Sequence, residues 1–192
     1  PHVFAVTAGM EIRYGIQAVD DSRWQSSTSL DLSEQNLISC APDYFGWGHC
    51  SGGTVTDPLK YAKTEGVVTE SCFPYTESEA PCTACAPSER FKLSWYAAYN
   101  QGFGPYGDAT IDNIKSFILD GYPVILLVDV YQDLSYYASG IYIPRTGVQV
   151  GSTAMVMVGW GRDSGKDYWI LMNLWGENWG MDGFVKMGYP EV

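Results

Sequence analysis

The 192-residue sequence predicts an α+β fold with two lobes, a helical lobe first and a β-rich lobe second. Helical periodicity opens the chain, because Phe4, Ala8, Ile12 and Ile16 recur at four-residue spacing. That spacing lays an apolar stripe along one face of a buried helix, which we expect to run to about residue 19. In the second half, short apolar runs alternate with turns that contain Gly and Asp, a pattern typical of successive antiparallel strands.

Three more helices are expected from their boundary residues. Ser33 can cap a short helix that starts at residue 34, because a serine hydroxyl accepts from amides of the first turn. Asp57 and Pro58 open the next helix, which Gly66 ends, in the usual order of Pro near the start and Gly past the end. The last helix ends at Gly121 and carries four apolar residues on one face: Ile111, Ile114, Phe117 and Ile118.

The strands are expected at residues 123–128, 154–158, 168–172 and 184–187. Residues 20–31 are polar and rich in serine, so we expect a loop there. We place the helical lobe at residues 1–93 and the β-rich lobe at residues 94–192.

Charge and hydropathy exclude two kinds of partner. Twenty-two acidic residues face eleven basic ones, and a net charge of −11 would repel the phosphates of a nucleic acid. Apolar runs are far shorter than the ~20 residues that span a bilayer, so we expect no membrane insertion. The chain begins at Pro1 without an initiator Met or a signal sequence, which suggests a processed or partial segment.

Five cysteines lie between Cys40 and Cys85. In an oxidising compartment they would form disulfides, whereas in the cytosol the spacing of Cys82 and Cys85 would suggest redox or metal chemistry. Zinc needs four suitable ligands, and only His2 and His49 could join the thiols. We therefore favour disulfides and expect neither a metal nor a cofactor.

Four segments share one family pattern. Residues 167–184 read DYWILMNLWGENWGMDGF, and LSEQNLISC (32–40), CSGG (50–53) and GVVTESCFPY (66–75) precede them in the chain. This set, in this order, resembles the papain family of cysteine proteases over nearly the whole chain. Cys72 before Phe73-Pro74-Tyr75, and the TESEAPC that follows, look most like cathepsin C. The resemblance implies a papain-like fold with a helical left lobe, a β-barrel-like right lobe and a substrate cleft.

The resemblance also implies that the catalytic pair is missing. In this family a Cys at the start of the central helix attacks the peptide carbonyl, and a His on the other lobe activates it. Phe4 matches the Phe of the family's Cys-Trp-Ala-Phe motif, which puts Pro1 at the Cys position. Residues 152–155 (STAM), before VGWG at 158–161, put Thr153 at the His position. Neither residue can do the chemistry of the one that it replaces.

Asn173 and Trp175 match the family's Asn and the Trp that shields it. With threonine at position 153, we expect Asn173 to hydrogen-bond within its own lobe. His2 matches the motif Trp and His49 a loop position, so we interpret both as surface or locally bonded residues. We also expect Trp160, Trp175 and Trp179 to pack together as one aromatic edge.

The remaining site residues follow from the same resemblance. It implies disulfides Cys40–Cys82 and Cys72–Cys85, with Cys50 unpaired because its partner would lie upstream of Pro1. Gly52 and Gly53 match the glycine strip along which extended peptides pair with the cleft. Turn geometry alone is an equally good reason for the two glycines.

The function that we expect is that of a catalytically inactive homologue, a pseudoprotease acting as a protein-binding or structural subunit of a larger assembly. A peptide-binding protein that uses the retained cleft is the alternative. An active peptidase with unusual catalysts is a third hypothesis, which would need replacements for both lost residues. The cysteines and the family suggest a secretory, lysosomal-type or other oxidising compartment.

Overall fold

A computed structural model describes residues 1–20, 30–42, 49–83, 85, 90–97, 110–144 and 147–189. It contains two compact units, which we call the helical unit (His2–Thr110) and the sheet unit (Ile111–Val192, with Pro1). The chain therefore has the α+β composition that the sequence predicts. The predicted boundary between residues 93 and 94 stays a prediction.

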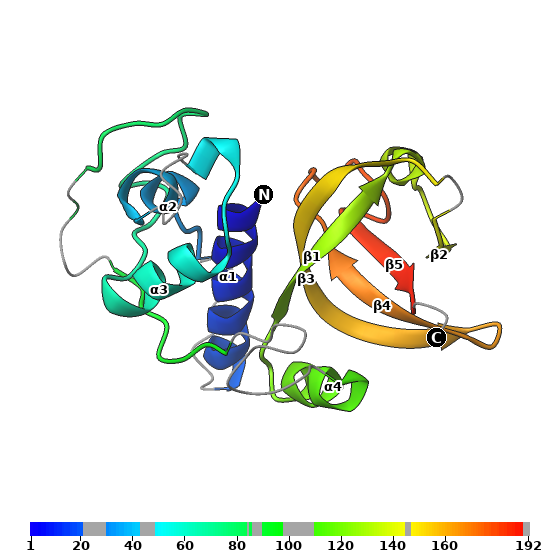
Figure 1. The fold of residues 1–192 in the computed structure, drawn as a ribbon. Coiled ribbons are helices and arrows are strands. Elements are labelled where there is room, and N and C mark those ends of the chain that lie inside the picture. Colours follow the sequence, from blue (N-terminus) through cyan, green and yellow to red (C-terminus); the bar gives the residue numbers. More distant parts are fainter. Residues whose placement is uncertain are drawn as a thin grey trace. The chain divides into compact units, whose positions relative to one another are not determined.

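The helical unit contains α1 (His2–Asp20), α2 (Glu34–Cys40), the 3-10 helix η1 (His49–Ser51) and α3 (Thr56–Thr64) (Figure 1). Helix α1 packs against α2 and α3. Ser33 caps α2 as predicted, since its Oγ accepts from the Asn36 N–H at 2.9 Å. Helix α3 begins one residue before the predicted Asp57, and Gly66 follows its end at φ +86°.

The buried face of α1 differs from the predicted stripe. Its buried apolar side chains are Val3, Ala5, Val6, Ala8 and Met10, whereas the other stripe residues, Phe4, Ile12 and Ile16, are only half-buried. The first turns of the helix are covered on several sides, so a one-sided periodic pattern cannot mark the buried face there. Phe4 instead packs edge-to-face on Tyr75, with ring centroids 5.2 Å apart.

The sheet unit contains α4 (Ile111–Leu119), β1 (Val124–Tyr131), the 3-10 helix η3 (Gln132–Tyr136), β2 (Ile141–Tyr142), β3 (Gln149–Asp163), β4 (Lys166–Met172) and β5 (Phe184–Gly188). The strand order is β1-β3-β4-β5-β2. Neighbours among β1, β3, β4 and β5 are antiparallel, as predicted. The expected strands do not include β2, which pairs with β5 in parallel, so the sheet is mixed.

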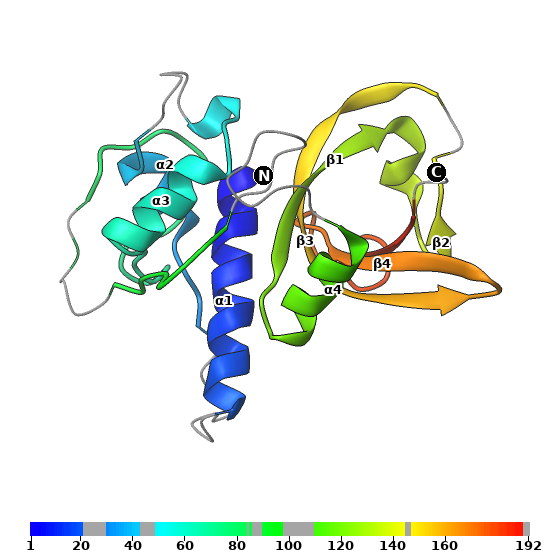
Figure 2. The ribbon, with the colours of Figure 1, turned by 60° about the horizontal axis from the view of Figure 1, so that its bottom comes forward.

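The core of the sheet unit lies on the inner face of the curved strands. Its fully covered members include Leu134, Met155, Leu171 and Val185. Helix α4 lies beside β1 and β3 (Figure 2). None of its residues is fully buried, although Ile114 and Ile118 pack against the core.

Helix α4 also makes a cation–π contact with the sheet. Lys115 Nζ lies 5.7 Å from the ring centroids of both Trp160 and Tyr189. Tyr189 in turn stacks on Trp169 at 4.6 Å. A lysine above aromatic faces is stabilised by their negative potential, so this contact helps to hold α4 on the sheet.

Candidate functional site

Two of the candidate residues, Pro1 and His2, stand at the start of the chain. Pro1 is exposed and precedes the helix, where a fixed φ and a missing N–H are tolerated. His2 is only 3% exposed, so of the two expected alternatives, a surface residue or a locally bonded one, the surface position is wrong. Its ring packs against Gly53, because a Cβ built on Gly53 would lie 2.8 Å from His2 Nε2. For His49, the side chain lies outside the described residues.

The two glycines after η1 have different local reasons to be glycine. Gly52 has φ +114° and open space where a side chain would begin, so its backbone conformation is the constraint. Gly53 is constrained by the His2 ring as well, because any side chain would meet it. The positive φ values of both glycines agree with the turn geometry that the sequence suggests, and the contact with His2 is an additional constraint on Gly53.

Cys50 lies in η1 and is exposed. All five cysteines lie in the described residues, and Cys50 is the one without a disulfide. Its N–H donates to Glu79 Oε1 at 2.8 Å. Partial burial and then the Glu79 carboxylate raise the pKa of the Cys50 thiol. The thiol is therefore protonated at neutral pH, which makes it a poor nucleophile.

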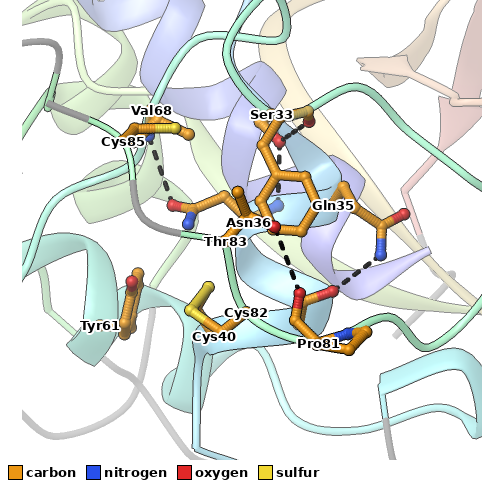
Figure 3. Close-up of a disulfide and its surroundings, with 12 residues drawn as sticks. Ser33, Gln35, Asn36, Cys40, Tyr61, Val68, Pro81, Cys82, Thr83 and Cys85 are labelled. Atoms are coloured by element: carbon orange, nitrogen blue, oxygen red, sulfur yellow. Dashed lines mark hydrogen bonds between the residues drawn. A yellow bond between two sulfur atoms is a disulfide. The ribbon is translucent and has the colours of Figure 1, made fainter.

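The other four cysteines pair as the resemblance implies. Cys40 bonds to Cys82 with Cα atoms 4.9 Å apart, and Cys72 bonds to Cys85 with Cα atoms 6.3 Å apart. The first disulfide lies at the end of α2, as Figure 3 shows. The first disulfide therefore attaches residue 82 to the end of α2, and the second attaches residue 72 to residue 85.

Side chains of α2 hold the same segment. Gln35 is buried, and its Oε1 accepts from the N–H of Thr76 while its Nε2 donates to the carbonyl of Ser78, each at 2.9 Å. Ser33 Oγ donates to the carbonyl of Phe73 at 2.5 Å. Together with the disulfides, these bonds give the loop after residue 69 a defined path over α2.

The sheet unit holds Thr153, which the resemblance places at the position of the catalytic histidine. Thr153 lies in β3 opposite Val128 of β1 and is 5% exposed. Its hydroxyl does not ionise near neutral pH. A small, buried side chain, that of Thr153, therefore stands at the position that the resemblance assigns to the histidine.

Asn173 follows β4 directly and is 4% exposed. Its N–H donates to the carbonyl of Gly183 at 2.9 Å, and its Oδ1 accepts from the N–H of Leu174 at 2.9 Å. Both bonds lie within the unit, as expected. Its Nδ2 is buried, and no described residue accepts a hydrogen bond from it. Of the two polar atoms of the Asn173 side chain, only Oδ1 therefore has a hydrogen bond to a described residue.

Asn173 and Thr153 belong to the same face of the sheet. Val156 of β3 pairs with Met172 of β4, and extending that register by one residue puts Asn173 opposite Met155. Since side chains alternate along a strand, Thr153 points to the same side as Met155. The two positions are therefore diagonal neighbours across the pair of strands.

Trp175 and Trp179 form the expected aromatic contact, with ring centroids 5.1 Å apart in an edge-to-face arrangement. Trp179 also contacts Tyr137 and donates from Nε1 to the carbonyl of Leu134 at 3.3 Å. Trp175 is 41% exposed. The prediction is wrong for Trp160, which lies opposite Trp169 beside Lys115, because β3 carries it to the other aromatic cluster.

Within the part of the chain that the structure describes, no group of three His, Cys, Asp or Glu is placed to hold a metal ion. None of the described helices is both long and apolar enough to cross a bilayer.

Comparison with known proteins defines the class to which this fold and these motifs belong. The model of the papain family of cysteine proteases matches residues 5–191. The chain therefore belongs to the papain family. Thr153, Asn173 and Trp175 lie within the matched residues, and Pro1 lies before them.

Particular relatives are cathepsin-like. The chain is 34% identical to cathepsin B-like protease 1 of Arabidopsis thaliana over 172 residues, which cover 83% of this chain and 45% of that protein. It is also 34% identical to a cathepsin L-like proteinase of Fasciola hepatica over 163 residues, 83% of this chain and 47% of that protein. The chain thus spans about half the length of the curated relatives it matches.

Solved structures agree on the papain-like fold. Digestive procathepsin L 3 of the Tenebrio molitor larval midgut superposes with a TM-score of 0.77 at 28% identity, covering 98% of this chain and 57% of that one. The bromelain protease of Ananas comosus superposes with a TM-score of 0.74 at 24% identity, covering 100% and 80%, which shows the fold alone.

Sequence reasoning missed a polar group between α1 and α2. Thr7 and Glu11 of α1 bond to Glu34 and to the backbone of Leu32. A pattern in the sequence could have indicated this group. Thr7 and Glu11 are four residues apart, so they lie on the same face of the predicted helix.

Proposed function

We propose that this chain is a catalytically inactive member of the papain family. The observation that carries the proposal is Thr153, a buried residue in β3 at the position that the resemblance assigns to the catalytic histidine. A general base must lose and regain a proton near neutral pH, and a threonine hydroxyl does not. Pro1 at the position of the nucleophile supports the same conclusion, since proline has no nucleophilic side chain.

Substitutes for the lost pair are hard to find among the described residues. Cys50 is a free thiol, but its neighbour Glu79 and partial burial favour the protonated form. His2 is buried against Gly53 in the helical unit. Activity would require two replacements that act together, so an active peptidase is the weakest of the three hypotheses.

The role that we propose for the inactive chain is that of a protein-binding or structural subunit of a larger assembly. Trp175 supports it, because this large side chain is 41% exposed while its edge rests on Trp179. Tyr136 of η3 is 85% exposed in the same unit. Exposed aromatic side chains on a rigid support are frequent energetic centres of protein interfaces.

Peptide binding by the retained cleft is the second candidate, and Gly53 favours it. Gly53 is exposed while the His2 ring beneath it is buried, so its backbone stays accessible to an extended peptide. We further propose that the helical unit is most like that of cathepsin C, from Cys72 and its disulfide to Cys85. The two disulfides favour a secretory, lysosomal-type or other oxidising compartment.

The test of inactivity is a peptidase assay on the pure, sequence-verified protein, with papain as the positive control. We expect no turnover of dipeptidyl or peptidyl fluorogenic substrates and no labelling by a mechanism-based thiol probe. Thr153→His should restore nothing, because the nucleophile would still be missing. Turnover that such a probe abolishes would end the proposal.

The test of the subunit role is recovery of the protein from its native source under mild conditions. We expect gel filtration to place it in a larger species with a stoichiometric protein partner. A monomer that instead binds a library-selected peptide would favour the peptide-binding hypothesis over the assembly hypothesis.

A further inference from the structure

Two short hydrogen bonds to carboxyl groups join α1 to the chain around the start of α2. The N–H of Leu32 donates to Glu11 Oε1 at 2.7 Å. The hydroxyl of Thr7 donates to Glu34 Oε1 at 2.7 Å. Leu32 is fully buried, so its amide depends on Glu11 as its acceptor.

The carboxyl groups around these bonds repel one another. Glu34 and Asp31 are the charged groups that act on Glu11, and Glu70 and Asp31 act on Glu34. Burial, opposed by the Leu32 N–H and assisted by these neighbours, raises the pKa of Glu11 to about 7. Burial also raises the pKa of Glu34, against the hydrogen bond from Thr7.

Other charged side chains near Glu11 and Glu34 in the fold belong to α1, to α3 and to Lys92. Arg13 is two positions from Glu11 on α1, and side chains two apart do not face each other on a helix. Helix α3, which packs on α1 and α2, carries Asp57 near its start and two exposed lysines, Lys60 and Lys63. Lys92 Nζ donates to the carbonyl of Thr64 at the end of α3.

We propose that Glu11 and Glu34 act as a proton-operated clamp, which holds α1 to residues 31–34 while the pair carries a proton and loosens when that proton is lost. A carboxylic acid at Glu11 still accepts from Leu32 and adds no charge beside Glu34. Two carboxylates at this place would repel each other in a half-buried environment. This inference concerns pH and stability and is independent of the proposed function.

The sign of the effect follows from linkage. The pKa of Glu11 is higher in the folded chain, at about 7, than its ordinary value of 4.5. The folded state therefore holds the proton more tightly than the unfolded state. The resulting stabilisation is complete below about pH 4.5 and is lost as the pH rises through about 7. Acid thus tightens the helical unit, and neutral to alkaline solution loosens it.

The first experiment is urea unfolding of the whole chain at about pH 5.5 and about pH 8, followed by circular dichroism. The full shift corresponds to a few hundredfold in the unfolding equilibrium. Glu11 is partly exposed, and solvent screening should reduce the change to about tenfold in wild type. Glu11→Gln keeps an acceptor for Leu32 but cannot ionise, so its pH dependence should shrink to about threefold or less.

Glu65→Gln is the matched control, because Glu65 is an exposed glutamate at the end of α3 in the same unit. It should keep the pH dependence of wild type. The difference between wild type and Glu11→Gln also separates Glu11 from the two histidines, a residue type that titrates in this range. Equal pH dependence in all three proteins would overturn the clamp.

Hydrogen exchange of the wild-type protein decides the question if Glu11→Gln does not fold. After correction for the intrinsic rate, peptides covering residues 30–36 should exchange about tenfold faster at pH 8 than at pH 5.5. Peptides of β4 should not change. Equal protection of residues 30–36 at both pH values would refute the inference.

Discussion

At the scale of single residues, the contact between His2 and Gly53 makes a sharp prediction. Gly53→Ala places a Cβ 2.8 Å from His2 Nε2, so it should destabilise the protein by about 1–3 kcal/mol through overpacking. The loss of stability is measured by urea unfolding of Gly53→Ala, of His2→Ala and of the double variant. The double variant should be more stable than the sum of the single effects implies. If the two single effects on the free energy of unfolding simply add, the His2 ring moves away from residue 53 without a loss of stability, and the prediction is wrong.

Thr153 makes a second prediction at this scale. Its side chain is buried, so Thr153→Val removes a hydroxyl group and keeps the shape. We expect unfolding free energy to stay the same or rise by up to about 1 kcal/mol. Thermal unfolding is the measurement, with Thr7→Val as the control that should lose stability because Thr7 bonds to Glu34. A clear loss in Thr153→Val would show that the hydroxyl has a partner.

At the scale of elements, the two disulfides should matter most for the loop after residue 69. Each closed loop contributes about 2–4 kcal/mol in the usual range, chiefly by restricting the unfolded chain. Replacing Cys40 and Cys82 with serine should therefore lower the melting temperature more than replacing Cys50, which has no disulfide. A Cys50→Ser variant that melts as low as the double variant would contradict this assignment.

Whether an element can be predicted from the sequence depends on whether local residues or distant contacts determine it. Helix α2 was predictable because Ser33 and its neighbours act locally. Strand β2 has two residues and owes its place to its parallel pairing with β5, which leaves no periodic pattern. The side on which Trp160 lies depends on pairing with Trp169 across the sheet, so its separation from Trp175 needed the structure. The ring of His2 likewise lies against Gly53, fifty-one positions away, so this contact needed the structure too.

At the scale of the whole molecule, the proposed subunit role predicts one contact residue. If a partner binds the sheet unit, Trp175→Ala should weaken binding by about 2 kcal/mol or more, because an exposed aromatic on a rigid support contributes strongly to an interface. Isothermal titration with the purified partner is the measurement. Trp95→Ala, a change at a comparably exposed tryptophan in the helical unit, is the control and should bind as wild type does. Equal loss in both variants would argue for general unfolding.

The way α4 is attached has a consequence for how the native state fluctuates. With no fully buried residue, α4 depends on the half-buried Ile114 and Ile118 and on Lys115 between two rings. Strands β3 and β4, by contrast, share a ladder and the core. Detaching α4 therefore costs less free energy than opening the sheet. Thermal motion should release this helix as a separate cooperative unit well before global unfolding, and briefly uncover the apolar strip that it shields.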